Sequence, residues 1–111
     1  MANGKRIVLN TNDAIHFILL ENILYCKSEN SYTTFYLVNR EPIMVSKNIK
    51  EYERQLAGAS FFRSHQSYLV NLEHITKIDK QNSFTLYLTD KTEIPTSTRK
   101  RKMLLQILLK K

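Results

Sequence analysis

The stretch FFRSHQSYLVNLEHI, residues 61–75, is apolar at both ends and carries five polar side chains in succession between them. The five are Arg63, Ser64, His65, Gln66 and Ser67. A half-buried strand alternates polar and apolar side chains, and a core strand has few polar ones, so the run fits neither. We therefore predict a polar loop held rigidly at the surface, because the flanking FF and YLV segments are anchored in the core.

Most of the remaining chain has the pattern of β-strands. The first half contains five candidate strands, at residues 7–10, 14–20, 23–29, 31–38 and 41–46. Large side chains on both faces of 31–38 predict a central strand, whereas Pro42 favours an edge position for the next one. The second half is typical of a meander, with strands at 75–80, 83–89 and 91–95 and with Phe84, Leu86 and Leu88 on one face.

Two segments have helical periodicity instead. In residues 46–58, Ile49, Tyr52 and Leu56 share one helical face. Asn48 with Glu51 resembles a capping box, and Gly58 is expected at the C′ position that ends the helix. A second helix is predicted within 97–111, capped by Ser97 or Thr98. Its predicted apolar face consists of Met103, Leu104, Ile107 and Leu108.

The composition indicates one globular domain. The chain has 111 residues, of which 42% are apolar and 24% charged, and it contains only two glycines and two prolines. It has no apolar run long enough to cross a membrane and no signal-peptide pattern near its start. The single cysteine, Cys26, cannot form an internal disulfide, which suits a reducing compartment. We expect a soluble cytoplasmic domain that spans residues 1–111.

Positive charge is concentrated at the C-terminus. Residues 99–111 contain six Lys or Arg and no acidic residue, so they contribute +6 of the net charge of +7. Arg99, Lys100, Arg101 and Lys102 fall in the first turn of the predicted helix, where cations are unfavourable beside the positive end of the dipole. The arrangement favours an external polyanion, although a solvated basic surface would also account for it.

Enzymatic or metal chemistry has little support. Ser64, Ser67 and His65 lack the sequence context of a nucleophile elbow. His16, His65 and His74 lack the spacing of a zinc site, and Cys26 has no cysteine partner. No glycine-rich loop is present to hold nucleotide phosphates. We expect no catalytic site, metal or cofactor.

Nucleic acid suits the polar segments better. Arg63, His65 and Gln66 can donate hydrogen bonds to phosphates or base edges, and Gln can pair with adenine through two bonds. A second polar tip, KSENSY at residues 27–32, and the basic segment at 97–102 provide two further contacts. Each of the three segments has a plainer interpretation as a solvated turn.

Four segments together resemble the LytTR family of DNA-binding domains, the output modules of bacterial LytR/AlgR-type response regulators. They are ILYCKSENSYTTFYL, IMVSKNIKEYERQL, FFRSHQSYLVNLEHI and IPTSTRKRKMLL, in that order along the chain. The resemblance implies a mostly β, elongated fold of several antiparallel sheets with short helices. In such domains, loops from the sheets enter successive major grooves of duplex DNA.

The resemblance also implies which residues contact DNA. Base contacts fall on Gln66, on Arg99 and on the segment Asn30, Ser31 and Tyr32. The other predicted DNA-binding residues are Arg63, His65, Ser67, Lys100, Arg101 and Lys102, with Arg63 and the basic cluster at 99–102 neutralising phosphates. Family members usually carry an N-terminal receiver domain, which this chain has no room for, and they occupy paired DNA repeats.

We therefore predict sequence-specific duplex DNA binding by the output domain of a bacterial transcriptional response regulator. Two alternatives remain open. One is an RNA or single-strand binder that stacks bases on Tyr32, Tyr36 or Tyr87. The other is a module that binds an anionic membrane surface through an interfacial helix at residues 99–111, although we expect no membrane partner.

Overall fold

The computed structural model describes residues 5–110. The first half contains β1 (Arg6–Asn10), β2 (Ile15–Leu19), η1 (Leu20–Asn22), β3 (Ile23–Glu29), β4 (Tyr32–Leu37), β5 (Arg40–Val45) and α1 (Ile49–Gln55). The second half contains β6 (Phe61–His65), β7 (Tyr68–Asn71), η2 (Leu72–His74), β8 (Ile75–Asp79), β9 (Thr85–Leu88), β10 (Glu93–Ile94), η3 (Thr98–Lys100) and α2 (Arg101–Leu108).

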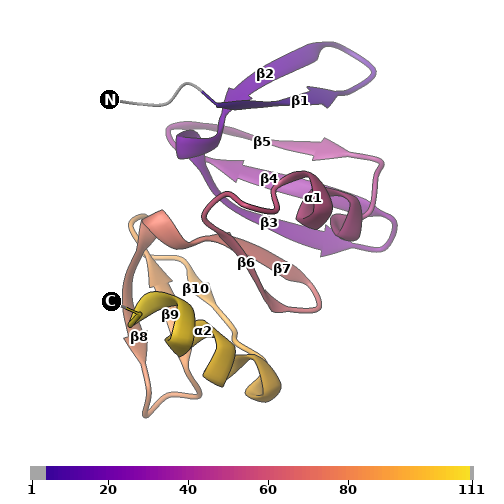
Figure 1. Ribbon diagram of the computed structural model, residues 1–111. Coiled ribbons are helices and arrows are strands. Elements are labelled where there is room, and N and C mark those ends of the chain that lie inside the picture. Colours follow the sequence, from indigo (N-terminus) through magenta and orange to yellow (C-terminus); the bar gives the residue numbers. More distant parts are fainter. Residues whose placement is uncertain (1–4, 111) are drawn as a thin grey trace.

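The strands form three antiparallel sheets that succeed one another along the molecule (Figure 1). The β1–β2 hairpin lies at one end, the sheet β5-β4-β3-β7-β6 in the middle, and the meander β10-β9-β8 at the other end. The molecule measures 43 Å along its longest axis and 25 Å along its shortest. The expected mostly β fold of several antiparallel sheets is confirmed, as are the interior position of β4 and the edge position of β5.

Both faces of the five-stranded sheet are buried, each against a different core. Neighbouring side chains on a strand point to opposite faces, so Leu69 of β7 joins the first core and Val70 the second. The first core lies against the β1–β2 hairpin and α1, where the ring of Phe35 meets that of Tyr52 edge-on at 4.8 Å. The second lies against the meander and α2 and includes Leu86, Leu88, Ile94 and Leu104.

The helix α1 forms as the pattern predicts. Ile49, Tyr52 and Leu56 are all buried, and the Oδ1 of Asn48 accepts a hydrogen bond from the Glu51 N–H at 3.2 Å. A full capping box would also have the Glu51 carboxylate accept a hydrogen bond from the Asn48 N–H. Here that carboxylate accepts hydrogen bonds from the Arg54 and Gln55 side chains instead. Gly58 has a φ of +89°, as expected of a residue that ends a helix, but it lies two residues beyond the C-cap Leu56 rather than one.

Phe84, predicted to lie in a strand at residues 83–89, lies outside the observed strand. Ser83 and Phe84 have φ values of +53° and +57°, so they lie in the turn before β9, which begins only at Thr85. Instead of packing below the strand, the Phe84 ring lies 5.1 Å from the guanidinium carbon of Arg101. This long-range contact between the turn and α2 is invisible to a period-two sequence pattern.

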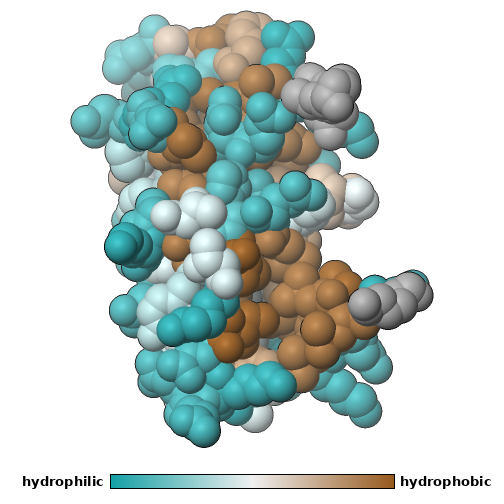
Figure 2. All heavy atoms as spheres, turned by 90° about the vertical axis from the view of Figure 1, so that its left-hand side faces the viewer, coloured by the Kyte–Doolittle hydropathy of each residue, from teal (hydrophilic) through white to brown (hydrophobic). Residues whose placement is uncertain are grey.

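The C-terminal helix differs most from its prediction. A 3₁₀ turn, η3, precedes it, and neither Ser97 nor Thr98 makes a side-chain cap, because the chain enters α2 directly from that turn. Of the four predicted apolar positions only Leu104 is buried, whereas Met103, Ile107 and Leu108 are exposed. Figure 2 shows hydrophobic residues on the surface around this end of the chain. The helix is peripheral, and Leu104 is its one fully buried side chain, while Arg101 contacts Phe84.

Asn71 connects the sheet to the chain segment before it. Its buried side-chain nitrogen donates to the carbonyls of Ile23 at 2.9 Å and Leu20 at 3.3 Å, and its Oδ1 accepts from the Glu73 N–H at 3.0 Å. The amide therefore satisfies backbone groups at the ends of both 3₁₀ turns. It holds β7 in place beside β3.

We expect Asn71→Ala to lower the free energy of unfolding by about 2 to 3 kcal/mol, because it removes the hydrogen bonds that this buried amide makes to the Ile23 and Leu20 carbonyls and to the Glu73 N–H. Chemical denaturation measures this. Asn48→Ala is the matched control, since it removes an exposed helix cap and is expected to cost about 1 kcal/mol. A cost for Asn71→Ala no larger than that of Asn48→Ala would contradict the bracing role.

Candidate nucleic-acid interface

Three polar segments lie on the same side of the molecule. They are the β3–β4 turn at Asn30 and Ser31, the β6–β7 turn at Gln66 and Ser67, and the η3 turn at 98–100 (Figure 1). A backbone hydrogen bond holds the β6–β7 turn beside β3, since the Ser28 N–H donates to the Ser67 carbonyl at 2.8 Å. The sheet thus brings together segments that the sequence separates by more than thirty residues.

Ser64 ties the segment before η3 to β6. Its hydroxyl donates to the Pro95 carbonyl at 2.9 Å, and its own carbonyl accepts from the Ser97 N–H at 2.8 Å. The side chain is fully buried. Ser64 therefore has a structural role and places η3 beside the β6–β7 turn.

The polar run at 63–67 is not the continuous loop that the sequence predicts. Arg63, Ser64 and His65 belong to β6, and only Gln66 and Ser67 lie in the turn. The run departs from strand alternation because Ser64 finds a hydrogen-bonding partner inside the fold. Gln66 is the exposed member.

Arg63 braces the turn from the side. Its Nη2 donates to the Gln66 carbonyl at 2.6 Å and its Nε to the His65 carbonyl at 3.2 Å. Its Nη1 forms an ion pair with the Glu53 carboxylate at 2.7 Å, and only 13% of the side chain is exposed. These bonds use one N–H on each nitrogen of the guanidinium, so Arg63 holds the turn in this structure, and its role as a phosphate contact stays a prediction. Sequence reasoning missed Glu53, ten residues away on α1, because no local pattern pairs the two.

His65 accepts a hydrogen bond at Nδ1 from the Ser67 N–H, over 3.1 Å. An accepting Nδ1 places the proton of the neutral ring on Nε2. The ring also meets Tyr68 edge-on, with centroids 5.9 Å apart. His65 therefore presents a fixed donor beside Gln66.

The β3–β4 turn exposes all three predicted residues. Asn30 adopts a φ of +57°, a conformation that asparagine tolerates well, while Ser31 and Tyr32 are exposed beside it. Lys27, on the adjacent strand, lies with its ammonium 5.8 Å from the Tyr68 ring. Interaction with Tyr68 raises the pKa of Lys27, and the ammonium also lies 3.7 Å from the Glu29 carboxylate.

The basic cluster divides into two kinds of side chain. Arg99 and Lys102 are exposed. Lys100 has its ammonium 5.7 Å from the Phe62 ring, and the guanidinium of Arg101 lies over Phe84. Cations held over aromatic rings keep their charge but have less freedom to reach outward. The structure thus leaves Arg99 and Lys102 as the most accessible cations of the four.

The described residues offer little for catalysis. The Ser64 hydroxyl is committed to Pro95, and His65 Nδ1 faces a backbone amide rather than a carboxylate. Burial raises the pKa of the Cys26 thiol, which makes it a poor nucleophile. Among residues 5–110 no cluster of three potential metal ligands occurs.

Comparison with known proteins gives consistent results. The family model of the LytTr DNA-binding domain matches residues 13–109. The transcriptional regulatory protein LytR of Staphylococcus aureus (strain MW2) is 30% identical over 81 residues, which cover 73% of this chain and 32% of that protein. The transcriptional regulatory protein YpdB of Escherichia coli O6:H1 is 32% identical over 111 residues, covering 91% of this chain and 45% of YpdB.

A solved LytTr DNA-binding domain of a response regulator from Bacillus cereus has the same fold. It superposes with a TM-score of 0.78 at 23% identity, covering 93% of this chain and 95% of that one. The chain spans less than half the length of the curated relatives above.

Arg63→Ala is expected to loosen the β6–β7 turn, because it removes the donors to two turn carbonyls. Hydrogen exchange of the Ser67 amide measures this, and we expect it to accelerate roughly tenfold. Arg54→Ala, which removes an exposed arginine from the α1 ion pair, is the matched control and leaves that rate unchanged. Arg63→Lys is expected to resemble Arg63→Ala, since one ammonium cannot replace the planar fork. Full protection of Ser67 in Arg63→Ala would rule out the brace.

Proposed function

Because the chain belongs to the LytTr family of DNA-binding domains, we propose that it recognises a specific duplex sequence as the output domain of a bacterial transcriptional response regulator. The observation that carries this proposal is the position of three polar turns on the same side of the molecule, next to a sheet whose two faces are buried. Rigid turns at fixed separations can match the repeating grooves of a duplex. The regulatory names of LytR and YpdB add support.

Gln66 and Arg99 are proposed to read base edges, together with the turn at Asn30, Ser31 and Tyr32. Gln66 and Arg99 are exposed at the tips of their segments, and their side chains can make two-bond contacts with adenine and guanine respectively. His65 and Ser67 flank the Gln66 side chain and offer a ring N–H and a hydroxyl as additional donors. Lys102 is assigned to phosphate, because it is exposed one helical turn beyond Arg99.

Lys100, Arg101 and Arg63 contribute mainly through charge and position in this proposal. Lys100 and Arg101 lie over aromatic rings and raise the positive potential of the surface there. Arg63 fixes the shape of the β6–β7 turn. Positive potential attracts DNA without regard to sequence, whereas the exposed tips discriminate. We propose no catalytic activity for this domain.

The chain is proposed to act as one DNA-binding domain, residues 1–111, in partnership with a receiver domain that precedes it in the full-length protein. Its relatives are more than twice as long as the part that this chain matches. We place the regulator in the cytoplasm, where DNA is accessible. Among residues 5–110 no helix has the length and hydrophobicity needed to cross a bilayer.

Binding of single-stranded nucleic acid has less support, because most of the tyrosines that would stack on bases are engaged in other contacts. Tyr36 stacks on Tyr25 with centroids 4.5 Å apart, and Tyr87 lies under the ammonium of Lys77 at 4.6 Å. Of the three tyrosines considered for base stacking, Tyr32 alone is largely exposed. The exposed Met103, Ile107 and Leu109 on and beside α2 do favour an anionic membrane surface as the second candidate.

Selection from a random duplex pool, followed by binding to duplex, single strand and anionic vesicles, separates these functions. We expect tight and salt-dependent binding to the selected duplex, with each phosphate contact adding about 0.9 to the slope of log K against log salt. Binding to vesicles but not duplex would favour the membrane candidate.

Reading and positioning residues are expected to respond differently to mutation. Gln66→Ala and Arg99→Ala each cost about 1 to 3 kcal/mol on the selected site and less on unrelated DNA, because they remove base contacts. Lys102→Ala, the matched control, weakens both duplexes about equally and lowers the salt slope by roughly one unit. Equal losses on all duplexes for Gln66→Ala and Arg99→Ala would show that specificity comes from DNA shape or from other residues.

Two copies of the domain are expected on one selected site when it contains two repeats about one helical turn apart, because such repeats face the same side of the duplex. Sedimentation of the complex measures the stoichiometry. Inserting half a helical turn between the repeats turns them to opposite sides and is the matched control. A strict one-to-one complex on the two-repeat duplex would contradict this arrangement.

A further inference from the structure

The β1 strand has an edge that no other described strand covers. Its one partner is β2, and the five residue pairs from Arg6–Leu19 to Asn10–Ile15 run without a bulge. In most proteins the edge strands of a sheet are protected from pairing with another chain by a proline, a bulge or an inward-pointing charge. The outer half of β1, at Val8, Leu9 and Asn10, contains none of these.

The hydrogen-bond pattern shows which groups face that edge. Leu20 N–H donates to the Lys5 carbonyl at 3.0 Å, and Thr11 N–H donates to the Ala14 carbonyl at 2.9 Å. In an antiparallel ladder such bonded pairs alternate with non-bonded ones. It follows that Arg6, Val8 and Asn10 direct their backbone N–H and C=O groups away from β2.

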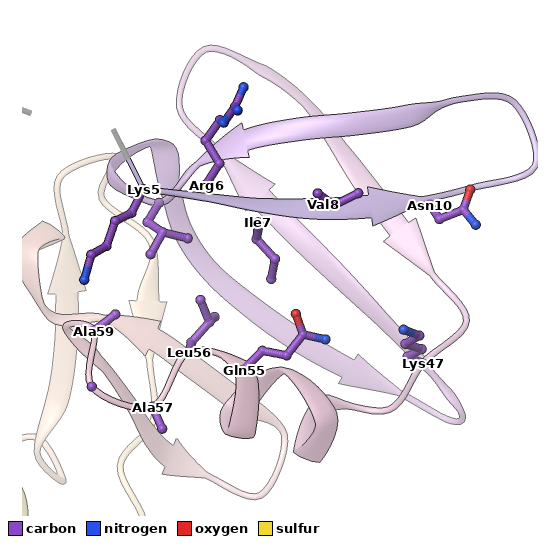
Figure 3. Close-up of a pocket in the computed structure, with 12 residues that line it drawn as sticks. Lys5, Arg6, Ile7, Val8, Asn10, Lys47, Gln55, Leu56, Ala57 and Ala59 are labelled. Carbon is purple, nitrogen blue, oxygen red and sulfur yellow. The ribbon is translucent and has the colours of Figure 1, made fainter. Parts of the chain in front are cut away.

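A groove runs along this edge (Figure 3). Its volume is about 730 Å³, and Arg6, Val8 and Asn10 all line it. The opposite wall is the turn after α1, where Ala57, Gly58 and Ala59 are small enough to leave space. A Cβ added to Gly58 would meet nothing within 4 Å, so the groove is open at that point.

The base of the groove is apolar and its ends are basic. Ile7 points from β1 toward Leu56 (Figure 3), and both side chains are buried. Lys5 and Lys47 lie at opposite ends of the groove, whereas Arg6 points away from it on the outer face of the hairpin, where its guanidinium lies 5.5 Å from the Phe17 ring. None of the lining residues is acidic.

We propose that this groove binds an extended acidic peptide segment of a protein partner, which adds to β1 as a third strand. Backbone groups at Arg6, Val8 and Asn10 supply the ladder, as in other cases of strand addition. Alternate side chains of the added strand face inward onto Ile7, Leu56 and the alanines, so they are apolar. The remaining side chains share the outer face with Arg6, and carboxylates there and at the two ends of the segment complement the charges of Arg6, Lys5 and Lys47.

The site is separate from the proposed DNA contacts. It lies on the β1–β2 hairpin and the turn after α1, whereas those contacts lie on the β3–β4, β6–β7 and η3 turns. Peptide binding is therefore testable without DNA, and its outcome does not depend on the proposed function.

The probe is a fluorescein-labelled decapeptide in which glutamate and valine alternate, with both termini blocked. We expect saturable binding to the chain and, in amide exchange, new protection of the Arg6, Val8 and Asn10 amides. A lysine–valine peptide of the same length is expected to bind at least tenfold more weakly, since its charge matches that of the groove. Equal binding of the two peptides, or protection elsewhere, overturns the proposal.

Val8→Pro tests the ladder directly. It removes an N–H that faces the groove and not one that bonds β2, and edge strands tolerate proline at such positions. We expect the glutamate peptide to bind roughly tenfold more weakly to Val8→Pro than to the matched control Val8→Thr, which keeps the N–H. Thermal melts verify that both variants are folded, and equal affinities in two folded variants overturn the proposal.

Lys47→Gln provides a test that leaves β1 untouched. We expect a two- to fivefold weaker affinity for the glutamate peptide, about the effect of one exposed ion pair. Unchanged affinity contradicts the acidic specificity. Protection of the three β1 amides that rises with protein concentration in the absence of peptide would identify a second copy of the chain as the occupant instead.

Discussion

Burial of both faces of the five-stranded sheet is the constraint on which the other elements depend. Tyr25 and Cys26 on β3, like Val70 and Leu69 on β7, are neighbours that enter opposite cores. Each face needs its own cover, so the hairpin and α1 pack on one side and the meander and α2 on the other. Burial in this apolar environment is the main cause that raises the pKa of Tyr25 to about 12, and the interaction with Tyr36 is the second cause. A sheet clamped in this way gives its turns a rigid base.

The rigidity is extended to the turns by polar side chains rather than by apolar packing. Ser64 ties β6 to the segment before η3, Arg63 ties the β6–β7 turn to α1, and Asn71 ties β7 to the turn before β3. Each donates hydrogen bonds to backbone carbonyls of another segment or of the turn itself. Polar residues in the FFRSHQSYLVN segment therefore serve two purposes, since Gln66 is presented outward while Arg63, Ser64 and Asn71 fix where it is presented.

The β1 edge and the apolar end of α2 are both exposed outside the three turns, and they differ in kind. The β1 edge offers directional backbone groups, a groove and a charge, which together specify the chemistry of an occupant. The apolar end of α2 offers only exposed Met103, Ile107, Leu108 and Leu109. Directional hydrogen bonds discriminate between partners more sharply than apolar area does. The β1 edge is therefore the more selective of the two surfaces.

Local patterns in the sequence determined much of this fold. Period-two alternation located most of the strands, Asn48 marked the start of α1, and the segments shared with the LytTR family indicated the sheets and the three polar turns. These features depend on residues near one another in the chain. The sequence also determined that positive charge gathers at the C-terminus.

Only the tertiary structure decided which polar residues are presented and which are used inside the fold. Arg63 meets Glu53 across ten residues, Ser64 meets Pro95 across thirty-one, and Arg101 covers Phe84 from another element. No periodicity encodes such pairs, because each depends on how separate elements pack. For the same reason the exposure of α2 and the uncovered edge of β1 became visible only once the three sheets were placed against one another.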